Sequence, residues 1–83
     1  MANKPWEKKR TVFRETLREL RDSKGLTQSE LGERLGRQQS YISKYENGER
    51  RLDYLEVLEI VDACEYSLHE LQAAYKTKMN AKT

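Results

Sequence analysis

Residues 25–50, GLTQSELGERLGRQQSYISKYENGER, contain two short predicted helices joined by a tight turn. Thr27 and Glu30 have the spacing of a capping box, in which each side chain satisfies a free backbone N–H at the start of a helix. Gly36 can adopt the left-handed conformation that ends this first helix after about two and a half turns. The second helix ends in the same way at Gly48. The segment therefore predicts a helix-turn-helix unit.

Apolar residues at helical spacing predict further helices on both sides of this unit. A helix is expected over 5–23, because Pro5 favours a first helical turn and Phe13, Leu17 and Leu20 follow at a spacing typical of one helix face. Two more helices are expected over 54–64 and 68–75. Their starts carry the capping pairs Asp53 with Glu56 and Ser67 with Glu70.

The sequence therefore predicts an all-α fold of five helices, since no stretch has the alternating pattern of a β-strand. We assign residues 1–7 to an N-terminal extension that includes the start of the first helix. Residues 8–76 form the predicted domain. Residues 77–83 lack an apolar face and are expected to be a flexible basic tail.

The length and composition exclude several classes of protein. A chain of 83 residues can build one small hydrophobic core, which excludes a two-domain enzyme. A single cysteine cannot form an intramolecular disulfide, and no apolar run approaches the roughly 18 residues of a membrane span. The N-terminal residues lack the apolar stretch of a secretory signal. We therefore expect a cytoplasmic protein with no membrane association.

The charged residues are unevenly distributed along the chain. Residues 1–51 contain 13 basic and 8 acidic side chains, whereas residues 52–75 contain 6 acidic side chains and no basic ones. This asymmetry is typical of a protein that binds a polyanion on one side, but solvated helix faces produce the same count. The charges alone leave both interpretations open.

The helix expected after Gly36 carries an unusual polar face. With Ile42 as its only aliphatic residue, a wheel at 100° per residue places short polar side chains and one lysine on a continuous arc. The arc consists of Gln39, Ser40, Ser43 and Lys44. Amide and hydroxyl groups of this kind hydrogen-bond the edges of bases, so this helix is suited to the major groove of DNA.

The quoted segment resembles the lambda-repressor-like helix-turn-helix family, also called the Cro, phage-repressor or XRE type. Leu-Thr-Gln opens the first helix of the unit, Gln-Ser opens the second, and Ile-Ser-Lys-Tyr-Glu-Asn-Gly closes it. The resemblance covers about residues 8 to 76 and implies the five-helix plan of that family. It also implies a bacterial or phage-encoded regulator that binds specific double-stranded DNA sequences, is nucleoid-associated when bound, and acts more often as a repressor than as an activator.

The resemblance implies roles for individual residues. Base contacts are implied for the polar arc: Gln39, Ser40, Ser43 and Lys44. Gln28 is implied to brace Gln39 and to place its backbone N–H beside a phosphate. Contacts to the DNA backbone are implied for Gln28, Arg37, Gln38, Tyr41, Asn47, Arg50 and Arg51. Arg21 and Glu46 occupy positions where the family often has an ion pair, which we expect to form.

Two residues depart from the usual pattern of the family. Gly32 stands where the family usually has Ala, and a glycine inside a helix costs about 1 kcal/mol relative to Ala. This cost is tolerable if the two helices of the unit cross closely there. Glu65 stands where the family usually has Gly. We therefore expect either a non-glycine residue at positive φ or a different turn.

A second apolar stripe on the helix over 54–64 suggests a partner. Two stripes on one helix exceed what one small core needs, so one of them faces either the last helix or a second subunit. We hypothesise a symmetric homodimer whose interface includes Tyr54, Leu58, Tyr66, Leu71 and Tyr75. The alternative function is an antitoxin-like protein-binding module whose acidic C-terminal half, residues 52–83, binds a partner protein.

The sequence offers no constellation for catalysis. Cys64 lies on an apolar stripe and is expected in the core rather than as a nucleophile. Cys64 and His69, the only histidine, are expected on different helix faces, which argues against a metal site. We therefore expect a protein that is not an enzyme and that has no metal and no cofactor.

Overall fold

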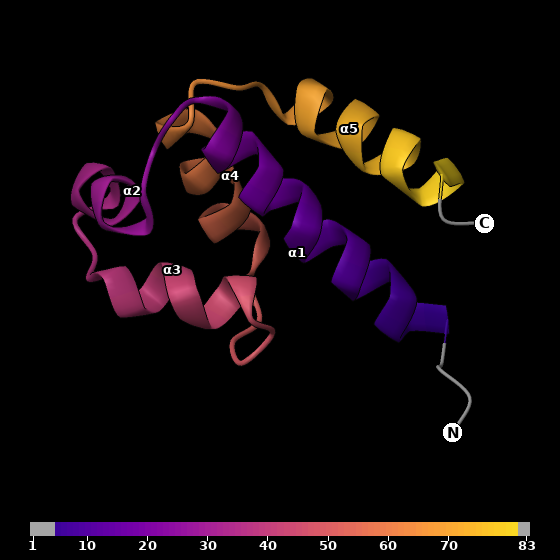
Figure 1. Ribbon diagram of the computed structural model, residues 1–83, viewed down its shortest axis with the longest axis horizontal. Helices are drawn as coiled ribbons and strands as arrows, with labels where there is room; N and C mark the ends of the chain where they lie inside the picture. Colours follow the sequence, from indigo (N-terminus) through magenta and orange to yellow (C-terminus); the bar gives the residue numbers. More distant parts are fainter. Residues whose placement is uncertain (1–4, 82–83) are drawn as a thin grey trace.

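The computed structural model describes residues 5–81 and folds them into five α-helices (Figure 1). The helices are α1 (Pro5–Ser23), α2 (Gln28–Leu35), α3 (Gln39–Glu46), α4 (Tyr54–Ala63) and α5 (Leu68–Ala81). No strand occurs within 5–81, so the predicted all-α class is confirmed. None of these helices has both the length and the apolar character needed to cross a membrane.

The start of α2 shows the capping box that the sequence predicts. The Glu30 backbone N–H donates to Thr27 Oγ1 at 3.0 Å, and the Thr27 backbone N–H donates to Glu30 Oε1 at 2.9 Å. The turn after α2 begins at Gly36 with a φ of 67°. A Cβ atom on Gly32 would lie 2.7 Å from the carbonyl oxygen of Arg37, so the close approach of this turn to α2 accounts for the glycine inside the helix.

The connection between α4 and α5 contains the residue for which two geometries were expected. Glu65 has a φ of 62°, so it occupies the left-handed region that usually favours glycine. Arg34 reaches this turn from α2, since its Nη1 donates to the carbonyl oxygen of Ala63 at 2.8 Å and to Glu65 Oε2 at 3.3 Å. The structure therefore shows the strained turn with a supporting contact from α2.

One hydrophobic core joins the first four helices and the start of α5. Among its most deeply buried side chains, at most 1% exposed, are residues of the first four helices and the residue that follows α4: Leu17, Leu31, Ile42, Tyr45, Ile60 and Cys64. Because Ile42 and Tyr45 anchor α3 in this core, the opposite side of α3 faces outward. Their packing holds α3 rigidly relative to the rest of the domain.

Helix α5 lies alongside α1, and it is longer than the sequence predicts (Figure 1). The rings of Phe13 and Tyr75 meet edge to face with centroids 6.2 Å apart. Beyond them, Lys78 pairs with Glu19 and lies 3.9 Å from Glu15 Oε1. The expected start of a flexible tail at residue 77 is therefore wrong, because these ion pairs to α1 accompany a helix that continues to Ala81. Residues 1–4 of the extension expected at 1–7, and residues 82–83 of the expected tail, lie outside the described residues.

Candidate nucleic-acid interface

The exposed side of α3 carries the four residues for which base contacts were expected. Gln39, Ser40 and Lys44 are exposed, and Ser43 is half-buried. Ser43 also accepts a hydrogen bond from Asn47, whose Nδ2 lies 3.3 Å from Ser43 Oγ. The helix thus presents one amide, two hydroxyls and one ammonium group to solvent, a set that matches the donors and acceptors of base edges.

The amide of Gln39 is held by a chain of side chains that begins on α1. Gln39 Nε2 donates to Gln28 Oε1 at 2.8 Å, and Gln28 Nε2 donates to Glu46 Oε1 at 2.9 Å. Glu46 accepts two hydrogen bonds from Arg21, at 2.7 Å from Nε and 2.9 Å from Nη2. We call Arg21, Glu46, Gln28 and Gln39 the amide relay. It connects α1, α2 and both ends of α3.

The inner half of the amide relay is a buried ion pair. The side chains of Arg21 and Glu46 are 7% and 3% exposed. Arg21 also donates to the carbonyl oxygen of Leu26 at 2.7 Å, so several of its donors are satisfied. The hydrogen bond from Arg21 to the Glu46 carboxylate raises the pKa of Arg21 above its ordinary value. The contact expected between these two residues is present, and it fixes the end of α3 against α1.

Two arginines flank the ring of Tyr41 at the edge of the exposed α3 face. The Cζ atoms of Arg37 and Arg50 lie 4.5 and 4.8 Å from the ring centroid. Such cation–π contacts restrict the guanidinium groups without neutralising their charge. Burial, and then the nearby Glu56 carboxylate, raise the pKa of Tyr41, so its hydroxyl remains a hydrogen-bond donor.

Glu56 joins this cluster, a role that the sequence analysis missed. Tyr41 Oη donates to Glu56 Oε2 at 3.2 Å, and Arg50 Nη2 lies 2.8 Å from the same oxygen. The Arg50 guanidinium, followed by the Asp53 backbone N–H, lowers the pKa of Glu56 to about 2. The sequence identified Glu56 only as part of a capping box, since its neighbours on α3 and in the next loop are distant in sequence. The signal that could have found it is a carboxylate soon after two consecutive arginines.

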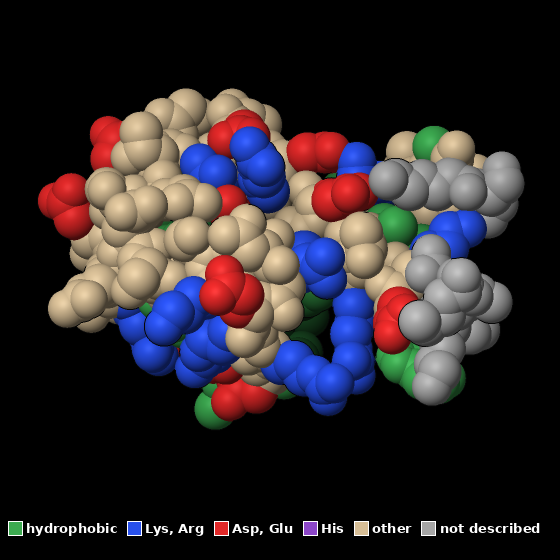
Figure 2. Space-filling model, turned by 60° about the horizontal axis from the view of Figure 1, so that its bottom comes forward, with side chains coloured by type: hydrophobic (Ala, Val, Ile, Leu, Met, Phe, Trp, Pro, Cys, Tyr) green, Lys and Arg blue, Asp and Glu red, His purple; other side chains and the backbone are tan. Residues whose placement is uncertain are grey.

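The remaining residues expected at the DNA backbone lie at the margins of α3. Gln38 precedes the helix and makes no side-chain capping bond, and Asn47 follows it. Gln38, Asn47 and Arg51 are exposed. Figure 2 views the molecule from the side of α3 and the loop that follows it, and Lys and Arg side chains gather there on both sides of a hollow. Gln38, Asn47 and Arg51 thus lie before α3, directly after it and in the loop that follows.

Of the residues expected at a dimer interface, Tyr54 and Tyr75 line one hollow, and Leu58 and Tyr66 line another. Tyr54 is 64% exposed, but Leu71 is only 3% exposed and belongs to the core. The expectation for Leu71 is therefore wrong, because helical spacing identified its apolar face but not the neighbouring helices that cover it. Tyr66 and Ser23 share a hydrogen bond of 2.5 Å between their hydroxyls, and Tyr75 packs against α1. Leu58 is half-buried, and Leu55, which the sequence analysis missed, is 70% exposed.

The part of the chain that the structure describes offers no metal site. Among residues 5–81, no three His, Cys, Asp or Glu side chains are grouped so that they could hold an ion. Cys64 is buried in the core, and burial raises the pKa of its thiol. A thiol with a raised pKa is a poor nucleophile at neutral pH.

Comparisons with known proteins agree with this geometry. A family model described as a helix-turn-helix domain matches residues 12–74. The fold is similar to that of an XRE-family like protein from Pseudomonas syringae pv. tomato str. DC3000, with 35% sequence identity, a TM-score of 0.78, and coverage of 86% of this chain and 87% of that chain. It is also similar to the clp gene regulator ClgR from Corynebacterium glutamicum, with 23% identity, a TM-score of 0.79, and coverage of 89% and 79%. This second likeness concerns the fold alone. No curated protein matches the chain.

Proposed function

The chain belongs to the XRE family of helix-turn-helix proteins, and from this premise we propose that it represses transcription by inserting α3 into the major groove of specific DNA sites. The family assignment makes it a DNA-binding transcriptional regulator and not an enzyme. The amide relay is the observation that carries the finer proposal. It fixes the side chain of Gln39 on the exposed face of α3, where an amide can contact a base.

The geometry of the amide relay supports recognition of adenine by Gln39. A glutamine side chain recognises adenine by accepting a hydrogen bond from N6 and donating one to N7. Gln39 uses one of its two N–H groups on Gln28. The carbonyl oxygen and the second N–H remain for the base. Ser40, Ser43 and Lys44 supply further contacts along the same groove.

Contacts to phosphates fix the register of α3 on the duplex. Gln28 is the first residue of α2, where backbone N–H groups and the helix dipole favour an anion. Arg37 and Arg50 are both held against the ring of Tyr41, which limits the side-chain entropy lost on binding. The other proposed backbone contacts are Gln38, Tyr41, Asn47 and Arg51.

A symmetric dimer fits this mode of binding. Two copies related by a two-fold axis would place two α3 helices in successive major grooves, about one helical turn of DNA apart. The exposed apolar side chains of Tyr54 and Leu55 at the start of α4 support a partner surface there. A bound dimer represses by covering the promoter, and it acts where the chromosome lies, in the cytoplasm at the nucleoid.

Selection of binding sites from a random duplex pool tests this proposal. The selection is made at about 150 mM salt, because specificity at low salt is masked by nonspecific attraction to phosphates. We expect an enriched motif of two inverted half-sites about one helical turn apart, with adenine at a shared position. Weak binding without enrichment, lost as salt rises, contradicts the proposal.

The second candidate function is an antitoxin-like module that binds a partner protein through residues 52–83. The exposed Tyr54 and Leu55, which lie in the acidic half of the chain, favour it. Co-expression with the product of the neighbouring gene tests this candidate. A stable complex that is lost on Tyr54→Ser and Leu55→Ser substitution supports it, and separate elution of the two proteins contradicts it.

A further inference from the structure

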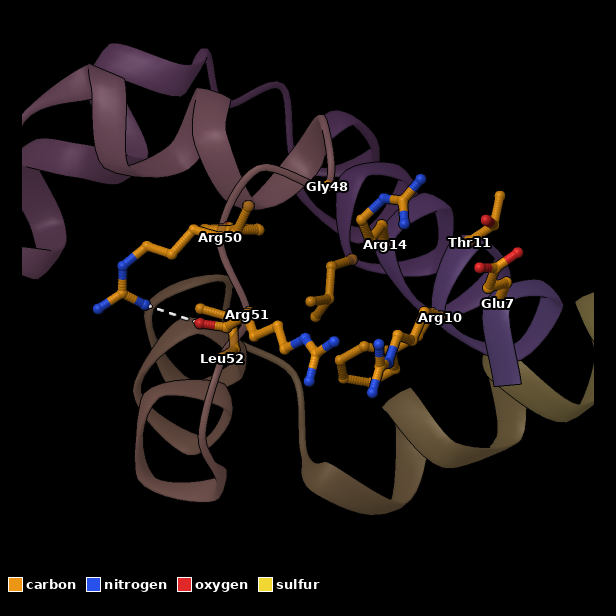
Figure 3. A pocket seen from close by; sticks show the side chains of 11 residues that line it. Glu7, Arg10, Thr11, Arg14, Gly48, Arg50, Arg51 and Leu52 are labelled. Carbon is orange, nitrogen blue, oxygen red and sulfur yellow. Dashed lines mark hydrogen bonds between the residues drawn. The ribbon is translucent and has the colours of Figure 1, made fainter. Parts of the chain in front are cut away.

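A pocket of about 530 Å³ lies between the first half of α1 and the loop that joins α3 to α4 (Figure 3). We call it the arginine pocket, because Arg10, Arg14, Arg50 and Arg51 contribute to its lining. Apolar side chains complete the lining, among them Phe13 and Leu17. The volume falls within the range of sites for small organic molecules.

Three arginines of the pocket have no ion-pair partner among the described residues. Within residues 5–81, no carboxylate oxygen lies within 4.0 Å of a charged nitrogen of Arg10, Arg14 or Arg51. The side chains of Arg10 and Arg51 extend toward each other from opposite sides, whereas Arg50 points away from them (Figure 3). Arg50 pairs instead with Glu56, which does not line the pocket. The one carboxylate in the lining is Glu7. Like charges that converge without a counterion are unfavourable, and a bound anion would relieve this repulsion.

Buried polar atoms beside the pocket lack hydrogen-bond partners. Tyr45 is 1% exposed and lines the pocket, and its hydroxyl makes no hydrogen bond to any described residue. The Nε atom of Arg14 is also buried without a partner in that part of the chain. Buried donors are almost always satisfied in folded proteins, so the unpartnered Nε of Arg14 in this lining indicates a missing acceptor.

Gly48 makes room for the guanidinium group of Arg14. A Cβ atom at this position would lie 2.9 Å from Arg14 Cζ, closer than side chains approach in real structures. The glycine also has a φ of 83°, which strains any other residue. The guanidinium group of Arg14 therefore lies directly against the backbone of the loop, at the wall of the pocket.

We propose that the arginine pocket binds a phosphate group. Guanidinium groups form paired, charge-assisted hydrogen bonds to phosphate oxygens. Two sources offer this chemistry. A small organic phosphate would place its phosphate among the arginines and its remainder against the apolar lining. A phosphate of the DNA backbone would reach the pocket from the adjacent proposed interface, and only this second source rests on the proposed function.

Nuclear magnetic resonance titrations with inorganic phosphate and with phenyl phosphate test the proposal. Ionic strength is held constant with chloride, and sulfate is the comparison anion. We expect saturable chemical-shift changes in the backbone amide resonances of Gly48 and its neighbours. The dissociation constant should be near 1 mM or below, which corresponds to a binding free energy of about 4 kcal/mol. Arg14→Gln and Arg51→Gln should each weaken binding about tenfold, as the loss of a charge-assisted hydrogen bond does. Arg18→Gln, an exposed arginine of α1, is the matched control and should change nothing.

A DNA titration at several salt concentrations distinguishes the two sources. If the pocket holds a backbone phosphate, Arg14→Gln reduces the slope of log affinity against log salt by about one, whereas a pocket for a small phosphate leaves the slope unchanged. The proposal is overturned if neither phosphate binds saturably, or if Arg14→Gln and Arg51→Gln bind phosphate like the wild type. If the phosphate proposal fails in this way but the protein still binds DNA, the proposed function is not contradicted.

Discussion

Gln39 Nε2 donates a hydrogen bond to Gln28 Oε1 at 2.8 Å, and through this bond the exposed face of α3 is connected to a buried ion pair. The orientation of an amide that faces solvent is thus set by residues in the interior. A side chain that is already ordered loses less entropy when it binds, so affinity for the correct base increases. If α3 enters the major groove as proposed, recognition depends on Arg21 and Glu46 as well as on the residues of the exposed face.

Substitution of Gln39 should remove specificity without removing general affinity for DNA. We expect Gln39→Ala to cost about 1 to 3 kcal/mol of binding free energy on the selected site and little on random DNA, because the lost contact is to a base edge. Arg37→Ala should weaken binding to both DNAs alike. Fluorescence anisotropy with both duplexes measures the two affinities. Gln72→Ala, which removes an exposed amide from α5, is the control. Equal losses of binding free energy on both DNAs for Gln39→Ala would exclude Gln39 from base recognition.

Removal of Glu46 should destabilise the fold strongly. Glu46→Ala leaves the guanidinium of Arg21 buried without its partner, and breaking a buried pair in this way costs about 3 to 5 kcal/mol. Arg18→Ala breaks an ion pair whose side chains are 66% and 56% exposed, and it should cost about 0 to 1 kcal/mol. Urea denaturation followed by circular dichroism measures the free energy of unfolding of both variants. A loss below 1 kcal/mol for Glu46→Ala would show that the pair does not hold α3 against α1.

The sequence predicted the features of the fold that depend on neighbouring residues. The capping boxes at Thr27, Asp53 and Ser67 form as expected, because each involves residues three positions apart. The all-α class and the helix-turn-helix follow from the same local patterns and from the resemblance of residues 25–50 to the family.

The features that the sequence did not reveal depend on contacts between distant segments. Leu71 was misplaced because periodicity shows that a face is apolar but not which helix covers it. The end of α5 was placed too early because the partners of Lys78 are on α1. Glu56 was missed in the candidate site because its contact with Arg50 depends on the path of the loop between them.

The turn between α4 and α5 should become more stable when Glu65 is replaced by glycine. A non-glycine residue in the left-handed region costs about 1 to 2 kcal/mol, and Glu65→Gly removes this cost. Glu65→Ala keeps the strain and removes the same exposed contact with Arg34, so it is the matched control. We expect Glu65→Gly to exceed Glu65→Ala by roughly 1 kcal/mol in free energy of unfolding. Equal stabilities in thermal or urea unfolding would show that the turn is unstrained.

The interaction between Glu56 and Arg50 should make stability depend on pH in the acid range. The pKa of Glu56 is lowered from 4.5 to about 2 in the folded protein, so its ionised form stabilises the fold above pH 4.5. This contribution is lost as the pH falls from 4.5 toward 2. Glu56→Gln should be less stable than the wild type at pH 7, and the difference should narrow over this interval.

Unfolding curves at a series of pH values measure this difference directly. Glu59→Gln is the control, since Glu59 is exposed and forms no ion pair with the described residues. A constant difference between wild type and Glu56→Gln from pH 7 to pH 2 would contradict the contribution assigned to the ionised carboxylate.

A double-mutant cycle between Gln39 and the adenine of the selected half-site tests the central claim most directly. Binding free energies are measured for wild type and Gln39→Ala on the selected duplex and on a duplex with a G·C pair in place of that A·T pair. If Gln39 recognises the adenine, the two changes are coupled by about 1 to 3 kcal/mol, because either change alone removes the same contact. The same cycle can be repeated at each base pair of the half-site. If Gln39→Ala and the base-pair replacement have additive effects on the binding free energy at every one of them, the placement of α3 in the major groove with Gln39 on a base is contradicted.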